Sequence, residues 1–323
     1  MIMVADVGAT KTVLACASGG PGGLVLASAH KFHNDQYDSF ESVLIAYIKA
    51  SGIGSVPAIG VAAAGPVVEG TCRLTNLDWT IDADSLATRF GFSGVVILND
   101  LQAGAYGIEH LSEDAFETIH PGRPSDFGNR VLISPGTDLG EAIIHGHEGQ
   151  YLPIAGEGGH ADFAPYNGET ARLWEYIRRA RGSVRVGDLL SGRGIAVIYS
   201  FLAEEGDGVD ETIALSPLPE QAVTQRALSG EDATAIRTVH LFFDILAAEA
   251  RIMALKTLSV GGVFFGGGVI PRLTTLLDRE RFLGLFCGSG PHRDFLSRIP
   301  LRVIIDTDLP LYGAAAFILS LSE

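Results

Sequence analysis

Two segments of the chain share one layout: an apolar strand, a short turn with glycine and threonine, and a second apolar strand. The first segment covers residues 2–16 and turns at Gly8-Ala9-Thr10, and the second covers residues 130–144 and turns at Gly136-Thr137. A layout that recurs within one chain is typical of a fold built by duplication. Because a hairpin fixes the first strands of a sheet, the repeat predicts two related halves with one sheet each.

Further strands and helices follow each hairpin. Short buried strands are predicted at 57–63 and 94–98 in the first half, and at 262–265 and 301–305 in the second. The second half is mostly helical between its hairpin and these strands, and its longest helix is predicted from 232 to 258. At 323 residues the chain is long enough for two domains with cores of their own. We therefore predict an α/β protein made of two βββαβα-type halves.

Charge and cysteine content limit the classes of function. The net charge of −15 makes the chain a poor general ligand for nucleic acid or an anionic membrane. No run of 18 apolar residues and no secretory leader pattern is found. The three cysteines, Cys16, Cys72 and Cys287, form no metal-binding pair. A cytoplasmic protein without a nucleic-acid or membrane partner is predicted.

The two glycine–threonine turns are candidate phosphate sites. Glycine allows backbone N–H groups to approach a phosphate closely, and threonine adds a hydroxyl. Asp6 stands just before the first turn, where its carboxylate could hold a hydrated Mg²⁺ ion. Each turn taken alone is more typical of an ordinary hairpin, and Asp6 is equally compatible with a residue that caps its turn. Two such turns in repeated halves favour a nucleotide bound between domains.

Asn99 and Asp100 follow directly after the buried strand at 94–98. Ligands of α/β proteins bind at the carboxyl ends of the strands, and an aspartate there can accept a proton from an attacking hydroxyl. Asparagine and aspartate are also preferred helix N-caps. Both roles are compatible with one another.

Two glycine-rich runs complete the candidate sites. Residues 156–165 place Glu157, His160 and Asp162 in a segment too rich in glycine for regular structure, where they could bind a small polar ligand or simply form a solvated turn. Gly266-Gly267-Gly268 follows a buried strand, so a flat group could lie on its backbone, or the run could be a tight connection to a helix.

Taken in order, these motifs resemble those of the ATP-dependent bacterial glucokinases, which belong to the actin, sugar kinase and heat-shock ATPase superfamily. The resemblance covers nearly the whole chain, and the run at 156–165 is its most specific part. The motifs are Asp6–Thr10, 74–79, Asn99-Asp100, Gly136–Gly140, 156–165, Leu190-Ser191-Gly192 and 261–272. The resemblance implies a duplicated ribonuclease H-like, actin-like ATPase fold with two domains around a cleft, and the phosphorylation of glucose to glucose 6-phosphate.

The resemblance also implies roles for residues that bind the sugar. Asp100 would be the base that takes the proton of the 6-hydroxyl group, and Asn99 with Asp100 would hold neighbouring hydroxyls. Glu157 would bind hydroxyls 2 and 3, and His160 the anomeric hydroxyl. Asp162 is expected to hold the loop through backbone hydrogen bonds.

The second substrate implied is ATP, with Mg²⁺ as the metal. Asp6 would lie near the ion, and the glycines at 267 and 268 would lie by the adenosine. The residues expected to bind the nucleotide are Asp6, Gly8, Ala9, Thr10, Lys11, Gly136, Thr137, Gly267 and Gly268. The implied small domain covers 1–108 plus 301–323, the large domain covers 109–300, and the protein is expected to form a homodimer.

The chain departs from the family at two sites. The family usually has a glutamate three residues before Leu-Ser-Gly, which contacts the sugar near its anomeric end, and Gly187 stands at that position here. The second phosphate turn usually reads Gly-Thr-Gly, and Asp138 replaces its last glycine. Loss of one charge-assisted hydrogen bond costs roughly 1.5–3 kcal/mol, and a carboxylate beside ATP would repel it. The departures keep two alternatives open: a kinase of another hexose, and a catalytically weakened sugar-binding relative.

Overall fold

The computed structural model describes residues 1–20, 23–75, 77–154, 156–206, 213 and 215–321. Asn76 of the motif at 74–79 and Ala155, directly before the run at 156–165, lie outside the described residues. The chain forms two compact units, Met1–Ala115 with Asp306–Glu323 (unit 1) and Phe116–Ile305 (unit 2). The predicted domains divide after residues 108 and 300, earlier than these units do, and the second difference arises because the strand Leu301–Ile304 pairs with Gly262–Phe265 in the sheet of unit 2.

Unit 1 is built on a five-stranded sheet with the order β3-β2-β1-β4-β8. The first three strands are antiparallel, whereas β1, β4 and β8 are parallel to one another. A separate three-stranded antiparallel sheet, β5-β6-β7, was not predicted. The strands are β1 (Ile2–Val7), β2 (Lys11–Gly20), β3 (Gly23–His33), β4 (Ala58–Ala63), β5 (Val67–Val68), β6 (Thr71–Arg73), β7 (Thr80–Asp82) and β8 (Gly94–Asn99).

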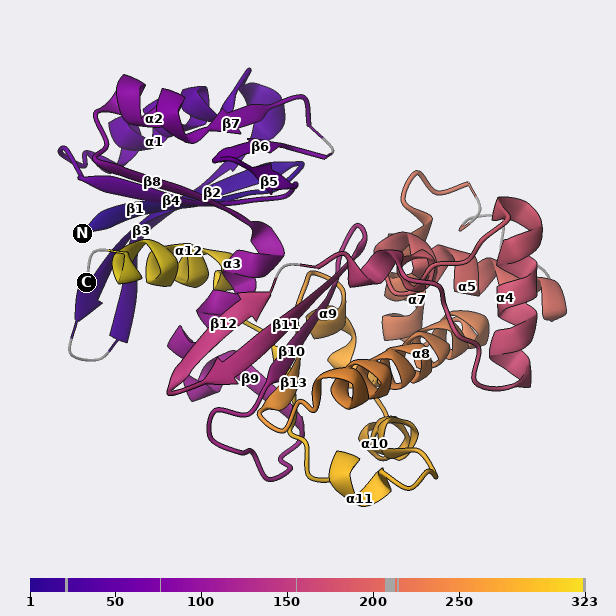
Figure 1. Ribbon diagram of the computed structural model, residues 1–323. Coiled ribbons are helices and arrows are strands. Elements are labelled where there is room, and N and C mark those ends of the chain that lie inside the picture. Colours follow the sequence, from indigo (N-terminus) through magenta and orange to yellow (C-terminus); the bar gives the residue numbers. More distant parts are fainter. Residues whose placement is uncertain (21–22, 76, 155, 207–212, 214, 322–323) are drawn as a thin grey trace. The chain divides into compact units, whose positions relative to one another are not determined.

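Helices cover both faces of the larger sheet of unit 1 (Figure 1). Since side chains alternate along a strand, β1 sends its odd-numbered residues to the core shared with α1 and α2, and Ile2 and Val4 to the core shared with α12. Asp6 follows the same alternation and therefore lies on the α12 face. Helices α3 and α12 pack so closely that any side chain on Gly313 would overlap the carbonyl of Ala103. The helices are α1 (Phe40–Ser51), α2 (Ala83–Phe90), α3 (Asp100–Gly107) and α12 (Leu309–Ser320).

Unit 2 repeats this strand order within a six-stranded sheet, β12-β11-β10-β13-β14-β9. Strands β12, β11 and β10 are antiparallel, β10, β13 and β14 are parallel, and β9 adds an antiparallel edge. The predicted duplication is thus confirmed in the order and direction of five strands of each sheet. The strands are β9 (Phe116–His120), β10 (Arg130–Pro135), β11 (Leu139–His147), β12 (Gln150–Ile154), β13 (Gly262–Phe265) and β14 (Leu301–Ile304).

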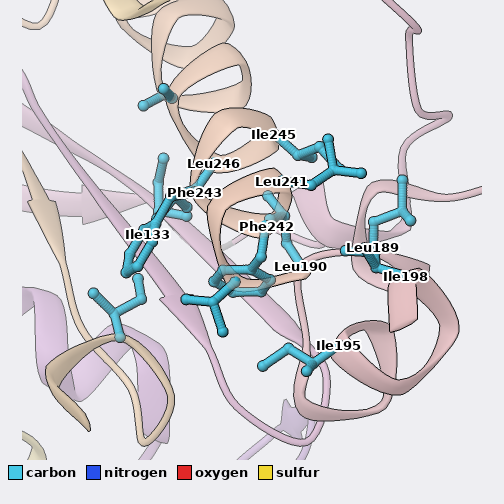
Figure 2. Packing of buried hydrophobic residues seen from close by; sticks show 14 of the residues in the cluster. Ile133, Leu189, Leu190, Ile195, Ile198, Leu241, Phe242, Phe243, Ile245 and Leu246 are labelled. Atoms are coloured by element: carbon cyan, nitrogen blue, oxygen red, sulfur yellow. The ribbon is translucent and has the colours of Figure 1, made fainter. Parts of the chain in front are cut away.

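The core of unit 2 forms around α8 (Ala233–Thr257), which begins at its N-cap Asp232 as predicted. Phe242 and Leu246 of α8 pack with Ile133 of β10 and with Ile195 of α5 in a single buried cluster (Figure 2). The other helices of the unit are α4 (Gly168–Arg181), α5 (Gly192–Glu205), α7 (Pro219–Ser229), α9 (Ile270–Leu273), α10 (Arg279–Cys287) and α11 (Arg293–Leu296).

Short 3₁₀ turns connect several elements of both units. They are η1 (Asn34–Gln36), η2 (Ile108–His110), η3 (Glu113–Ala115), η4 (Gly158–His160), η5 (Val186–Asp188) and η6 (Thr274–Leu276). Across the described residues, no helix combines the length and the apolar character that a membrane span needs.

Candidate active site

The turn between β1 and β2 is held in place by a buried asparagine. Asn34, 2% exposed, donates from Nδ2 to the carbonyl of Gly8 at 2.8 Å and accepts at Oδ1 from the Thr12 hydroxyl at 2.8 Å. Its backbone N–H donates to the Thr10 carbonyl at 3.0 Å, and the N–H of Gly8 donates to the carbonyl of Lys11 at 3.0 Å. The carbonyls of the turn are therefore used inside the unit. Sequence reasoning missed Asn34, since nothing in the sequence connects it to this turn.

The predicted residues Asp6, Asn99 and Asp100 gather at one edge of the sheet of unit 1. Val7, Ala63 and Asn99 are in register across β1, β4 and β8, so the carboxyl ends of these parallel strands lie side by side. Asp6 is one residue earlier on β1, and Asp100 is one residue later, at the start of α3.

Asn99 is the N-cap of α3, as one of its two predicted roles required. Its Oδ1 accepts from the N–H of Leu101 at 3.0 Å, and its Nδ2 donates to the carbonyl of Gly65 at 3.2 Å. Asp100 accepts from the same N–H of Leu101 at 2.8 Å through Oδ1. These bonds fix the backbone at the position where Asp100 leaves the sheet.

Negative charge is concentrated near Asp6. Burial raises the pKa of Asp6 to about 7, and the charges of Asp100 and Asp308 add to the rise while Lys11 opposes it. Asp308 precedes α12, and its pKa is raised by burial and by Asp306 and lowered by Lys11. Sequence reasoning missed Asp308, although an acidic residue before a helix is a recognisable signal.

The chemistry of these donors fits Mg²⁺. The ion takes oxygen ligands, usually one or two carboxylates completed by water and substrate phosphates. Asp6 offers such an oxygen, and a cation there would relieve the repulsion that raises its pKa. No cluster of three or more acidic, histidine or cysteine side chains suited to a metal occurs in the described residues.

The turn between β10 and β11 lies beside the glycine run after β13. The Gly136 N–H donates to the carbonyl of Asp138 at 2.9 Å, and the Gly136 carbonyl accepts from Gly192 at 2.9 Å. Gly267 has a φ of +81° and its α-carbon faces the carbonyl of Pro135 so closely that a side chain would overlap it. At Gly268 a side chain would meet nothing within 4 Å, so this stretch of backbone is open. Unit 2 thus brings together Gly136, Thr137, Gly267 and Gly268, all predicted to bind nucleotide.

Glu157 and His160 stand on the loop that contains η4. The His160 N–H donates to the Glu157 carbonyl at 3.0 Å, and His160 Nε2 lies 3.8 Å from Glu157 Oε2. Both side chains are exposed, by 52% for His160 and 81% for Glu157, and are therefore accessible to a ligand.

An arginine that was not predicted orients His160. Arg185 Nη1 lies 2.8 Å from His160 Nδ1, and Arg185 Nη2 donates to Asp188 Oδ1 at 2.9 Å. Burial alone would raise the pKa of Asp188, but hydrogen bonds from Arg185 and the charges of Arg185 and Arg181 hold it below its usual range. Because a guanidinium only donates, His160 Nδ1 must accept, and in the neutral ring the proton is on Nε2. His160 therefore presents an N–H donor at Nε2.

A buried glutamate lies behind this loop. Glu141 of β11 is 4% exposed, and its Oε2 occupies the space that a side chain on Gly158 would need. Its Oε1 finds no hydrogen-bond partner among the described residues. Burial raises the pKa of Glu141 to about 8, the charge of Glu249 on α8 adds to the rise, and Lys256 opposes it. A charged residue within an apolar strand was the available signal, and sequence reasoning did not use it.

The two departures from the family motifs, Asp138 and Gly187, prove to be neighbours. A β-carbon on residue 187 would lie 2.5 Å from Asp138 Oδ1. Gly187 is buried in η5, and Asp138 is partly exposed. The carboxylate of Asp138 is thus next to the position at which a side chain is missing.

Comparison with known proteins identifies relatives over the full length of the chain. The family model described as glucokinase matches residues 3–321. A glucokinase from Synechocystis is 31% identical over 346 aligned residues, which cover 97% of this chain and 96% of that protein.

Solved structures agree with this relationship. The glucokinase of an Antarctic psychrotroph superposes with a TM-score of 0.88 at 27% identity, covering 99% of this chain and 98% of the other. A ROK family glucokinase from Streptomyces griseus, solved in complex with glucose and AMPPNP, has the same fold with a TM-score of 0.65 at 21% identity and 99% coverage of each chain. The predicted actin-like ATPase fold is confirmed.

Proposed function

This chain belongs to the glucokinase family, and on that premise we propose that it transfers the γ-phosphoryl group of ATP to the 6-hydroxyl group of glucose. The activity common to the family is phosphorylation of a sugar by a kinase. The observation that carries the finer proposal is the position of Asp100, a carboxylate fixed at the carboxyl edge of a parallel sheet by the N-cap of α3.

In the proposed reaction Asp100 accepts the proton of the sugar 6-hydroxyl. The oxygen forms a bond to the γ-phosphorus of ATP, the bond from that phosphorus to the β,γ-bridging oxygen breaks, and ADP leaves. Phosphoryl transfer passes through a loose transition state, so the protein mainly positions groups and balances charge. Asn99 contributes by locking the start of α3, which sets the direction of Asp100.

At the other end of the sugar, Glu157 and His160 provide complementary hydrogen bonds. His160 offers its Nε2 proton, because Arg185 occupies Nδ1 as a donor. The Glu157 carboxylate accepts from two hydroxyl groups. A hydroxyl group can donate to one side chain and accept from the other, which suits a carbohydrate.

The backbone turns are proposed to bind ATP. In Gly8-Ala9-Thr10 with Lys11, and in Gly136-Thr137, the two glycines would let the phosphates approach closely, and the donors would be the threonine hydroxyls and N–H groups other than those of Gly8 and Gly136, which bond within their turns. The open backbone at Gly267-Gly268 would lie by the adenosine. The nucleotide analogue bound by the Streptomyces griseus protein of the same fold supports ATP as the second substrate.

Mg²⁺ is proposed to be held in part by Asp6. When bound, the ion would neutralise phosphate charge and the repulsion among the carboxylates near Asp6. Asp6 is suited to it because burial and two neighbouring carboxylates disfavour its own charge in the absence of a cation.

A substrate panel tests the proposal. The purified chain is assayed with Mg²⁺ and ATP against glucose, mannose, fructose, galactose and N-acetylglucosamine, with ADP formation as the readout. We expect the largest kcat/KM for glucose and no turnover without Mg²⁺. Preference for another hexose would replace glucose as the substrate, and absence of turnover with every sugar would refute the kinase proposal. Homodimer formation and a cytoplasmic location stay predictions.

A further inference from the structure

The space beside Gly187, where a side chain would lie, is occupied by neighbouring atoms. A β-carbon there would lie 2.5 Å from Asp138 Oδ1 and 2.9 Å from the carbonyl oxygen of Gly159. Both distances are well inside van der Waals contact. A residue larger than glycine at 187 would therefore require both the Asp138 carboxylate and the Gly159 backbone to shift.

The side chain of Asp138 faces Gly187 of η5. Its Oδ1 accepts from the N–H of Leu139 at 2.9 Å and faces Gly187, and its Oδ2 lies 4.0 Å from Arg193 Nη2. The side chain is 40% exposed, so solvent or a ligand reaches the carboxylate. The backbone of Asp138 belongs to the proposed phosphate turn, whereas its Oδ1 borders the same space at Gly187 as the carbonyl of Gly159, in the loop of Glu157 and His160.

This neighbourhood is fixed within unit 2. The Phe163 N–H donates to the Val184 carbonyl at 2.9 Å, and the Val186 N–H donates to the Ala161 carbonyl at 2.9 Å, which joins the loop to η5. Arg185 connects His160 to the buried Asp188. The loop of His160 and the segment that carries Gly187 are therefore joined by backbone and side-chain hydrogen bonds.

We propose that the carboxylate of Asp138 is a specificity-determining group of the sugar site, which takes the place of the side chain missing at Gly187. The inference rests on the proposed function and deepens it. Asp138 would accept a hydrogen bond from a sugar hydroxyl at the end of the ring that His160 contacts. A carboxylate only accepts, and His160 Nε2 donates, so one hydroxyl can be bound by both. The ligand class is a hexose with a free anomeric hydroxyl.

The alternative role for Asp138 is at the phosphates. There its charge would weaken ATP binding, and removing it would improve the KM for ATP. The two roles therefore predict changes in the KM of different substrates.

Steady-state kinetics of Asp138→Gly and Asp138→Asn separate them, with Asp126→Asn, an exposed aspartate of the same unit, as the matched control. We expect both variants to raise the KM for glucose by about 10- to 100-fold, the loss typical of a hydrogen bond to a charged group, with the KM for ATP unchanged. For 1-deoxyglucose, which lacks the anomeric hydroxyl, the same substitutions should change the KM by less than about threefold. The control should leave every constant unchanged.

The double variant Asp138→Gly/Gly187→Glu returns a carboxylate to this place from the other side. Since the Gly159 carbonyl still lies 2.9 Å from its β-carbon, the double variant should bind glucose more weakly than the unmodified chain but more tightly than Gly187→Glu, whose β-carbon also meets Asp138. Asp138→Asn keeps the shape of the side chain and covers the case in which the glycine variants fail to fold.

An unchanged KM for glucose in Asp138→Asn, or equal losses for glucose and 1-deoxyglucose, would overturn the inference. So would an improved KM for ATP with no effect on glucose. Glucose binding by calorimetry keeps this test separate from that of the proposed function. If the unmodified chain turns over no sugar but binds glucose, a weaker affinity in Asp138→Asn still supports the inference, and an equal affinity refutes it.

Discussion

Glu141 provides a measurable test of the electrostatics behind the sugar loop. The residue is 4% exposed, its Oε1 is unpartnered within the described part of the chain, and a second buried glutamate, Glu249, adds to its cost of ionisation. Replacement by glutamine keeps the shape of the side chain and removes the titrating proton. The consequence should appear as a change in how stability depends on pH.

The magnitude follows from the pKa of Glu141, which folding raises from 4.5 to about 8. Because the folded state holds the proton more tightly, this group contributes most to stability below pH 4.5, and that contribution is lost as the pH rises to about 8. At about 1.4 kcal/mol per unit of pKa, the loss amounts to several kcal/mol at full ionisation. Glu141→Gln has no such loss, so its stability relative to the unmodified chain should increase over this pH range and then level off.

Urea unfolding, followed by tryptophan fluorescence at about pH 5, 7 and 9, measures this difference. Trp174 lies in unit 2 and reports on its packing. Glu148→Gln is the matched control, because that side chain is 83% exposed. We expect a rising difference for Glu141→Gln and a flat one for Glu148→Gln. A difference for Glu141→Gln that does not change with pH would refute the account of this buried carboxyl.

Two further predictions concern unit 1. Asn34→Ala leaves the Gly8 carbonyl and the Thr12 hydroxyl without the side chain that binds them, so the free energy of unfolding should fall by about 2–4 kcal/mol. Because the turn is then less well held, the KM for ATP should rise more than the KM for glucose. Equal KM values for ATP in variant and parent would show that the turn does not bind the nucleotide. Asp6→Asn should raise the melting temperature in the presence of EDTA, because burial and two carboxylates disfavour the charge of Asp6, yet lower turnover with Mg²⁺ by at least about 100-fold. A lower melting temperature together with normal turnover would contradict both assignments.

Much of the fold could be predicted because its signals are local. The two hairpins show the period of a strand and the glycine of a turn, and α8 begins at a capping aspartate, Asp232, so its predicted limits differ from the structure by one residue at each end. The strand at 301–304, which the predicted small domain includes, pairs with β13 in the sheet of unit 2, since strand pairing depends on partners far along the chain.

The candidate site could be predicted only in part, for the same reason. Its exposed residues belong to compact motifs, whereas the residues that hold them in place are distant in sequence. Asn34 reaches Gly8 across 26 positions, and Arg185 reaches His160 across 25. The sequence shows Asp138 and Gly187 as two separate departures, and only the folded chain shows that they share one space.

The central claim is that Asp100 is the base of a sugar kinase, and Asp100→Asn tests it most directly. Asparagine keeps the hydrogen bond that Asp100 Oδ1 accepts from Leu101 but cannot take the proton of the sugar hydroxyl. We predict that kcat falls by about 10²–10⁴-fold while the Kd for glucose, measured by calorimetry, changes by less than about threefold. A variant that keeps kcat within about threefold of the parent would contradict the claim.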